Sequence, residues 1–339
     1  TLIAVWAPWR RPGLFHAPDP SVVPRGAGDL ARQLRFPAAR LGIDEDELLS
    51  ALEHASRPAQ AVALIQKLGY VGSERALPLL DKLARDHREY VAAAAVHAMA
   101  QIGGEEATAR LLDLLPSLRV RRDAVAALGL IATPRALEQL VKLAHESRSP
   151  LRQEAILALG QSGHEEVLGV FQDLIATGDD AVIQSVASAL GNFNGAAADV
   201  LLRELVAREN ANISTAAIYA LSDPADPETT AQLMAILAAG DSRRAEAAAY
   251  VLGRGGNPMA LSLLGQMARE GGAQTRRACI DALGRAGGDK ARGLLTELLQ
   301  SGRGELAHEA ARALVNLGDD AAIALVMKAV RDDQGMNGE

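Results

Sequence analysis

Residues 133–163 read TPRALEQLVKLAHESRSPLRQEAILALGQSG, and these 31 residues hold the pattern of two amphipathic helices joined by a turn. Leu140 and Leu143 in the first half are three residues apart, as are Ile156 and Leu159 in the second. That spacing returns side chains to the same face of an α-helix. The second half ends in an Ala-Leu-Gly step. The stretch therefore predicts a pair of helices with one apolar face each.

The same helix pair recurs along the chain at a nearly constant interval. The residue that ends the Ala-Leu-Gly step marks each copy, and seven of the eight intervals between these marks are 31 residues, the other being 29. We call the marks the glycine-step positions: Gly69, Ala100, Gly129, Gly160, Gly191, Ser222, Gly253, Gly284 and Val315. One helix pair cannot bury its apolar face alone, so the copies must stack into a continuous core. The repeat predicts an all-α fold: an α-solenoid, wound as a right-handed superhelix of about nine HEAT-like helix pairs and preceded by an extended N-terminal arm.

The composition fits such an array and excludes one class of function. Hydrophobic residues make up 49% of the 339 residues and aromatic residues only 3%, so the core is expected to consist mostly of Ala, Leu, Val and Ile. The net charge of −7 lacks the basic footprint that a general nucleic-acid-binding protein needs. The single cysteine, Cys279, stands five residues before a glycine-step position, where the repeat carries small residues. It is predicted to be a core residue and not a reactive thiol.

The two ends of the chain differ from the repeats. Residues 1–28 are predicted to form an apolar, Pro- and Gly-rich arm and linker, residues 29–331 the solenoid, and residues 332–339 a polar tail. The apolar run at the start is too short to span a bilayer, which takes about 20 apolar residues.

Two interpretations of the arm remain open. It is either the trailing interfacial end of a membrane helix that starts upstream, or a hydrophobic arm that docks on a partner or on the first helices. Arginine after the apolar run slightly favours the cytoplasmic over the periplasmic side of a membrane. The residues predicted to form this membrane or partner anchor are Trp6, Trp9, Arg10 and Arg11.

The 31-residue unit quoted above closely resembles the PBS-lyase HEAT-like repeat, and the resemblance extends over about residues 42–331. The resemblance implies a solenoid of helix pairs in which the second helix of each pair lines the concave surface. It does not identify a function, since one repeat fold hosts many activities. Members of the family include phycobilin lyase subunits, a metal-dependent deoxyhypusine hydroxylase and many bacterial scaffold proteins.

The resemblance to the hydroxylase provides a test for a di-iron site. That enzyme carries His-Glu pairs on the second helix of several repeats, at positions that lie seven and six residues before the glycine step. Only His308 and Glu309 fit this pattern here. One pair cannot supply the converging ligands that a metal needs, so we expect a surface pair. The chain also lacks phosphate-loop, H-E-x-x-H and C-x-x-C motifs, and we predict no catalytic residue, no metal and no cofactor.

The phase of the repeat predicts a binding surface. Residues seven and three before each glycine-step position and one after it are four apart, so they share a helix face, which we call the inner stripe. Tyr219 and Tyr250 occupy the same slot in adjacent units, and tyrosine is a favoured interface anchor. The stripe next to them is basic, which suits an acidic or carboxylate-bearing segment, although weak cross-helix ion pairs are the alternative. The residues predicted to bind a partner are Tyr219, Tyr250, Arg254, Arg277, Asp281, Arg285, Arg312, His97 and Leu157.

These observations predict a non-catalytic scaffold that binds one or more protein partners on its concave face and does not bind nucleic acid. The apolar arm adds the expectation of membrane contact, and with it an accessory subunit of a membrane-associated, bacterial complex. The alternative is a tetrapyrrole lyase or chaperone of the phycobilin-lyase type, which the repeat alone does not distinguish from a scaffold.

Overall fold

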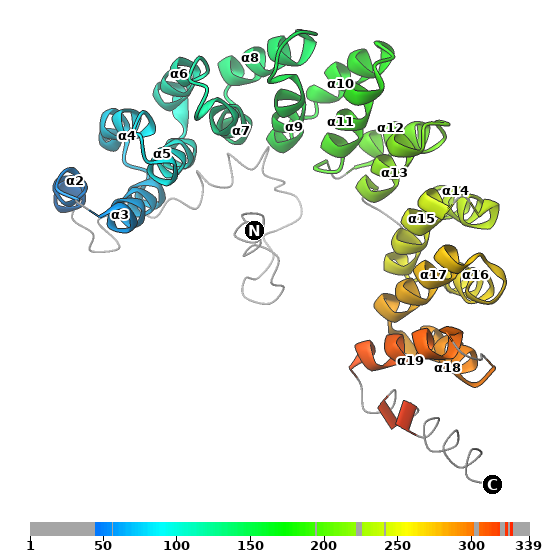
Figure 1. Ribbon diagram of the computed structural model, residues 1–339. Coiled ribbons are helices and arrows are strands. Elements are labelled where there is room, and N and C mark those ends of the chain that lie inside the picture. The colour runs from blue at the N-terminus through cyan, green and yellow to red at the C-terminus, as the bar shows by residue number, and fades with distance from the viewer. Residues whose placement is uncertain are drawn as a thin grey trace, which may run out of the picture.

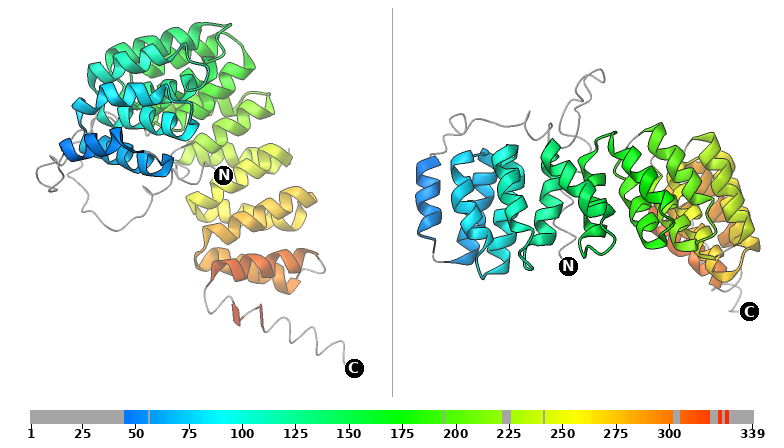
Figure 2. Two further views of the ribbon diagram at one scale, coloured as in Figure 1. Left: turned by 60° about the vertical axis from the view of Figure 1, so that its left-hand side comes forward. Right: turned by 90° about the horizontal axis from the view of Figure 1, so that it is seen from above.

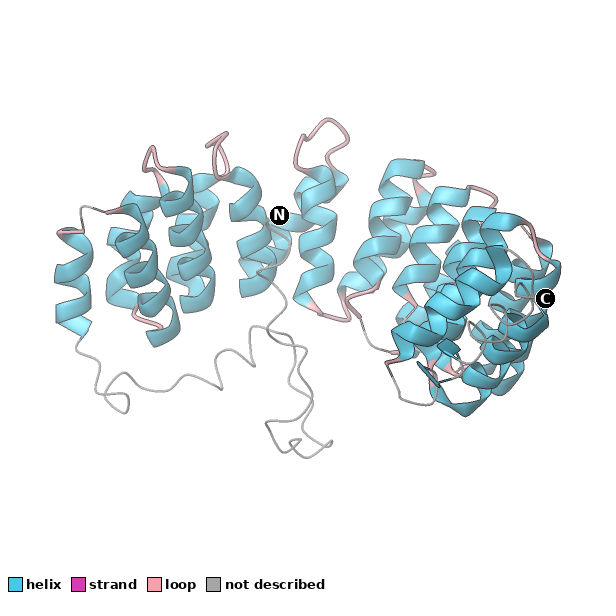
Figure 3. Ribbon diagram, turned by 60° about the horizontal axis from the view of Figure 1, so that its bottom comes forward, coloured by secondary structure: helices cyan, strands magenta, loops and turns pink. Residues whose placement is uncertain are grey.

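The computed structural model describes residues 45–55, 57–193, 195–221, 226–240, 242–301, 305–318, 323–324 and 326–327. These residues form α-helices, one 3₁₀ turn and connecting loops, and none of them lies in a strand (Figure 3). The predicted N-terminal arm and the polar tail lie outside the described residues, as do Trp6, Trp9, Arg10 and Arg11.

The described helices follow one another as nine pairs. In chain order they are α2 (Glu45–Glu53) with α3 (Pro58–Val71); α4 (Leu77–Ala84), which follows the 3₁₀ turn Glu74–Ala76, with α5 (Glu89–Ile102); α6 (Gly104–Leu114) with α7 (Arg121–Ile131); α8 (Pro134–His145) with α9 (Arg152–Ser162); α10 (Val167–Ala176) with α11 (Asp180–Leu190); α12 (Ala196–Val206) with α13 (Ala211–Ala220); α14 (Pro227–Ala239) with α15 (Ser242–Gly255); α16 (Pro258–Glu270) with α17 (Ala273–Ala286); and α18 (Gly288–Ser301) with α19 (Glu305–Leu317).

The pairs stand side by side in a single curved row. The first helix of each pair lies on the outer side of the arc and the second on the inner side, so α5 to α19 with odd numbers line the concave face (Figure 1). Seen from above, the helices form one continuous array and not two separate bodies (Figure 2). The predicted all-α solenoid is therefore confirmed.

Helix starts follow from local side-chain chemistry. The side chain of Thr133 accepts a hydrogen bond from the backbone N–H of Ala136, and Asp226 and Asn257 cap α14 and α16 in the same way. A proline follows each of these capping residues, where its fixed φ and missing N–H suit the first helical turn. These turn residues separate the helices at the boundaries that the sequence predicts.

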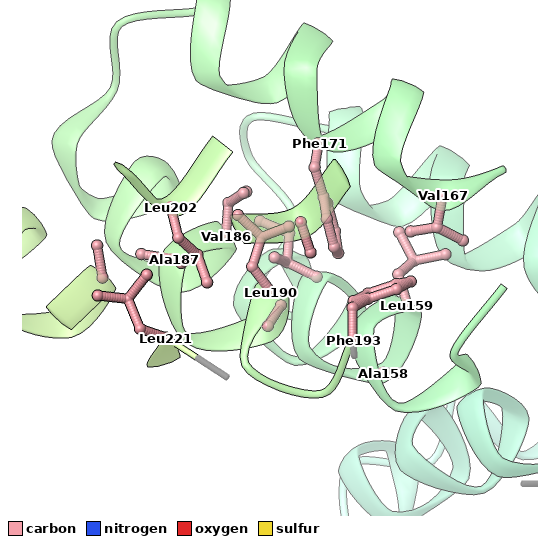
Figure 4. Packing of buried hydrophobic residues seen from close by; sticks show 14 of the residues in the cluster. Ala158, Leu159, Val167, Phe171, Val186, Ala187, Leu190, Phe193, Leu202 and Leu221 are labelled. Carbon is pink, nitrogen blue, oxygen red and sulfur yellow. The ribbon is translucent and has the colours of Figure 1, made fainter. Parts of the chain in front are cut away.

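The core lies between the inner and outer helices. Phe171 of α10 is fully buried and meets Phe193, just after α11, edge to face with ring centroids 6.0 Å apart. Figure 4 shows Phe171 and Phe193 among Leu159, Leu190 and other aliphatic side chains. The predicted leucine position of the outer helices is fully buried in every described unit from α4 to α18: Leu80, Leu111, Leu140, Phe171, Leu202, Leu233, Leu264 and Leu295.

Glycine at the step positions lets adjacent inner helices approach closely. A Cβ atom added to Gly160 of α9 would lie 2.6 Å from the carbonyl oxygen of Ala189 in α11, which is below van der Waals contact. The equivalent atom on Gly253 of α15 would lie 2.8 Å from the carbonyl oxygen of Ala282 in α17. Because the obstructing atoms belong to the backbone, they cannot move aside cheaply.

The arc follows from the difference between the two sides. Adjacent inner helices approach each other closely across glycine and alanine, whereas adjacent outer helices approach less closely and stand on leucine and phenylalanine. A thin inner seam and a thick outer layer turn each pair slightly against the previous one. Repetition of that small turn bends the row into an arc.

Polar side chains also join successive inner helices at their N-terminal ends. Asn210, which caps α13, donates a hydrogen bond from its Nδ2 to Asp180 of α11 at 2.8 Å. Arg243 of α15 donates to Oδ1 of Asn212 of α13 at 2.8 Å. These contacts set the lateral register of neighbouring pairs, while the buried side chains supply most of the stability.

The glycine step predicts opposite effects for two Gly→Ala substitutions. Gly160→Ala should lower the free energy of unfolding by about 1–3 kcal/mol, because the new methyl group overpacks the seam. Gly169 lies on the exposed face of α10, where an added Cβ meets nothing within 4 Å. Gly169→Ala should therefore raise stability by about 0.5–1 kcal/mol through helix propensity. Denaturant unfolding followed by circular dichroism measures both, and equal signs would refute the seam argument.

The single cysteine gives a second prediction. Cys279 of α17 is fully buried, and burial raises the pKa of its thiol to about 12. Since the thiolate is the reactive form, alkylation by iodoacetamide should be slow in the native protein and fast in concentrated guanidinium chloride. A Ser301→Cys variant made in a Cys279→Ala background places a thiol at the exposed end of α18 and should react quickly in both states. Fast labelling of native Cys279 would show that the unit opens readily.

Candidate functional site

The inner stripe is open to solvent along the arc. Its described members are exposed or partly exposed, while the residues one, four and five before most glycine-step positions are buried. The stripe therefore lies on the inner helices, which face the hollow of the arc. One member, Asp223, falls outside the described residues.

Three side chains from consecutive inner helices meet on this stripe. The rings of Tyr219 of α13 and Tyr250 of α15 lie edge to face, with centroids 5.6 Å apart and planes at 65°. The guanidinium carbon of Arg285 of α17 lies 5.2 Å from the centroid of the Tyr250 ring, at cation–π distance. Tyr219 remains 46% exposed. We call Tyr219, Tyr250 and Arg285 the tyrosine–arginine cluster.

Electrostatics keep the Tyr219 phenol protonated. Partial burial raises the pKa of Tyr219, the nearby carboxylate of Glu246 and the Tyr250 phenol raise it further, and Arg285 acts weakly in the opposite direction. The neutral hydroxyl can both donate and accept a hydrogen bond at the edge of an apolar ring. The cluster thus offers apolar area, a polar tip and one positive charge to a ligand.

Two of the four predicted arginines already have carboxylate partners. Arg277 of α17 lies 2.8 Å from Glu309 and 3.2 Å from Glu305 of α19, and these partners raise its pKa. Arg312 of α19 lies 3.3 Å from Asp281 of α17. The cross-helix ion pairs that the sequence left open as an alternative are thus present at these two arginines.

The other two predicted arginines are different. Arg254 of α15 and Arg285 of α17 are exposed, and neither has an ion pair with a carboxylate among the described residues. Both stand one residue after a glycine step, on the same edge of the inner stripe. The positive charge available to a ligand is therefore concentrated at these two residues.

The structure corrects the expected surface pair of His308 and Glu309. His308 is exposed, but Glu309 is only 7% exposed because the guanidinium of Arg277 from the preceding unit covers it. Arg122 of α7 and Glu154 of α9 repeat the arrangement at 2.8 Å. In both cases an arginine seven before one glycine step meets a glutamate six before the next, a signal that the sequence held and the motif search missed.

His97 and Leu157 lie on the inner stripe but apart from the cluster. His97 belongs to α5, where desolvation by packed neighbours lowers its pKa and its Nε2 lies 3.3 Å from the amide nitrogen of Gln101. Leu157 belongs to α9 and is 39% exposed. The structure therefore does not join these two residues to the tyrosine–arginine cluster.

Two searches of the described part of the chain gave negative results. No group of three or more His, Cys, Asp or Glu side chains there is placed to hold a metal ion. None of the helices in that part is long and apolar enough to cross a membrane.

Comparisons with known proteins place the chain among solenoids. No curated protein matches it. Solved structures that resemble it include an engineered protein, with 22% identity, a TM-score of 0.37, and 84% of this chain and 91% of that chain covered. Human deoxyhypusine hydroxylase in complex with glycerol shares 19% identity, with a TM-score of 0.33 and coverage of 74% and 99%. Importin beta shares 13% identity, with a TM-score of 0.38 and coverage of 83% and 46%.

The family assignment rests on the repeats themselves. The family model of HEAT repeats matches residues 45–117, 110–191 and 260–336, which together make up more than half of the chain. The matched stretches contain the paired helices, the glycine steps and the buried leucine positions described above. The chain belongs to the HEAT-repeat family.

Proposed function

We propose that this chain is a non-catalytic scaffold that holds a protein partner on its concave face, with the tyrosine–arginine cluster as the anchor. HEAT-repeat solenoids commonly mediate protein interactions, and this family membership supports the general class. The observation that carries the specific site is the contact of Tyr219 and Tyr250 on an open surface. Only 3% of the residues in this chain are aromatic, so two exposed rings in contact are a concentrated feature.

The cluster has the physical properties of an interface anchor. Aromatic rings offer a large contact area with few rotatable bonds, so their immobilisation on binding costs little conformational entropy. Here the edge-to-face contact and the Arg285 guanidinium already restrain the rings before a partner arrives. A surface prepared in this way needs little rearrangement on binding.

Two finer assignments belong to the same proposal. The 31-residue spacing supports repeats of the PBS-lyase HEAT-like type. The apolar residues around Trp6 and Trp9, followed by Arg10, support an accessory subunit of a membrane-associated bacterial complex with the solenoid on the cytoplasmic side. Deletion of residues 1–28, followed by fractionation of membranes, tests the anchor separately from the concave face.

Site-specific photo-crosslinking tests the concave face. A photoreactive amino acid in place of Ser188, on the inner stripe of α11, should trap a partner in cells that produce the chain. The same group in place of Ser262, exposed on outer helix α16, should trap much less. Equal yields from the two positions would contradict binding on the inner helices.

Substitution of the anchor tests the cluster itself. The double variant Tyr219→Ala/Tyr250→Ala should reduce the crosslinking yield from position 188 at least tenfold, because truncation of anchor residues typically costs about 2 kcal/mol or more. The matched control is Tyr70→Ala/Tyr90→Ala, which removes tyrosines that are 70% and 74% exposed and lie outside the cluster. Both variants should retain the helical circular dichroism of the parent. Equal loss in the two double variants would remove the cluster from the interface.

A further inference from the structure

We infer that the partner element at the tyrosine–arginine cluster is an acidic, proline-containing segment in polyproline II conformation that crosses α13, α15 and α17. Two of its carboxylates, three residues apart, bind Arg254 and Arg285, and the apolar residues between them rest on Tyr219 and Tyr250. This inference rests on the proposed scaffold function and specifies the chemistry and the backbone shape of the partner.

Charge complementarity decides the sign of the ligand. Arg254 and Arg285 are exposed, and no described carboxylate forms an ion pair with either of them. Arg277 and Arg312 are held by Glu309 and Asp281, so a ligand would have to displace existing partners to reach them. Free guanidinium groups bind carboxylates through two parallel hydrogen bonds, and a partner with carboxylates at this edge gains that interaction without competition.

The glutamate nearest to the cluster lies too far away to neutralise this edge. Glu246 and Arg254 belong to the same helix, α15, and are eight residues apart. Eight residues rise by about 12 Å along a helix axis, which is beyond direct ion-pair contact. The inner stripe at α15 therefore has an acidic end at Glu246, a tyrosine in the middle and a basic end at Arg254.

Arg285 can bind a carboxylate while it stays on the ring of Tyr250. A guanidinium group that stacks on an aromatic face directs its N–H donors outward in its own plane, toward the rim of the ring. The guanidinium carbon lies 5.2 Å from the ring centroid, which leaves those donors available. The cation–π contact thus holds Arg285 in place for a ligand and does not replace one.

The spacing of the two arginines decides the backbone shape. They occupy the same position in consecutive units, on inner helices that pack directly against each other at the Gly253 step. Helices in such contact are about 8–10 Å apart. A polyproline II segment rises about 3.1 Å per residue with three residues per turn, so side chains three apart share a face and are about 9 Å apart.

Other backbone shapes fit less well. Side chains on one face of a β-strand are about 7 Å apart for neighbours and about 13 Å for the next, on either side of the required distance. An α-helical ligand offers about 6 Å or about 10.5 Å. Aromatic surfaces such as the one formed by Tyr219 and Tyr250 are also a known means of holding proline-rich segments.

Fluorescence anisotropy with labelled peptides and the full chain tests the inference. The central peptide carries Glu-Pro-Pro-Glu in a neutral host, and its comparators carry glutamates two or four residues apart, lysines in place of glutamates, or glutamates four and seven apart in an alanine-rich helical host. We expect saturable binding of the first peptide and at least tenfold weaker binding of each comparator. Binding should weaken as salt concentration rises, because exposed charges are screened.

Substitutions in the chain connect the binding to the two arginines. Arg254→Gln and Arg285→Gln should each weaken binding of the Glu-Pro-Pro-Glu peptide about tenfold. They should have little effect on a Gln-Pro-Pro-Gln peptide, which lacks the charges. Arg135→Gln is the matched control, since Arg135 is exposed on outer helix α8 and lies away from the inner stripe.

The outcomes separate this inference from the proposed function. If no peptide binds, if spacing has no effect, or if the helical peptide binds more tightly, the extended acidic ligand is wrong. The scaffold proposal still stands in those cases when crosslinking from position 188 depends on the two tyrosines. If crosslinking is the same from the inner and outer helices, the proposed function fails whatever the peptides show.

Discussion

The close approach of each glycine-step residue to an alanine of the next inner helix is the constraint on which the rest of the structure depends. At Gly160 a single added carbon would lie 2.6 Å from the carbonyl oxygen of Ala189, so the seam has no room for a side chain. Leucine and phenylalanine hold the outer helices farther apart at every unit. The mismatch between a thin seam and a thick outer layer produces the arc and makes the exposed face of the inner helices its concave surface.

The phase of the repeat was enough to predict the core and the inner stripe. Burial at Leu140 and exposure at Leu157 both depend on where a residue stands relative to the glycine step, and that position is written in the sequence. The contact of Tyr219 with Tyr250 was foreseeable for the same reason, since equivalent residues of adjacent inner helices must be neighbours. What a strict period determines is the location of the backbone, and side chains follow it only to the first order.

The choice of side-chain partners could not be predicted from the period alone. Glu309 stands where a surface residue is expected, and it is buried because Arg277 reaches across from the preceding helix. Arg285 likewise lies over Tyr250, although the two residues occupy different slots of the stripe. Long side chains select a partner by rotamer and by competing charges over several ångströms, and these preferences leave little trace in a single unit. The predicted arm with Trp6 and Trp9 lies outside the described residues, and its role stays a prediction.

The same seam that shapes the arc also makes the concave face a ruler. Because glycine and alanine leave the inner helices almost no freedom to separate, equivalent side chains of neighbouring units are held at one nearly fixed distance. A ligand that crosses several helices must match this distance at every step, and each matched contact then adds to the others without distortion of the solenoid. A rigid period therefore selects partners by backbone conformation before any individual side chain is recognised, and the unpaired Arg254 and Arg285 add the selection by charge.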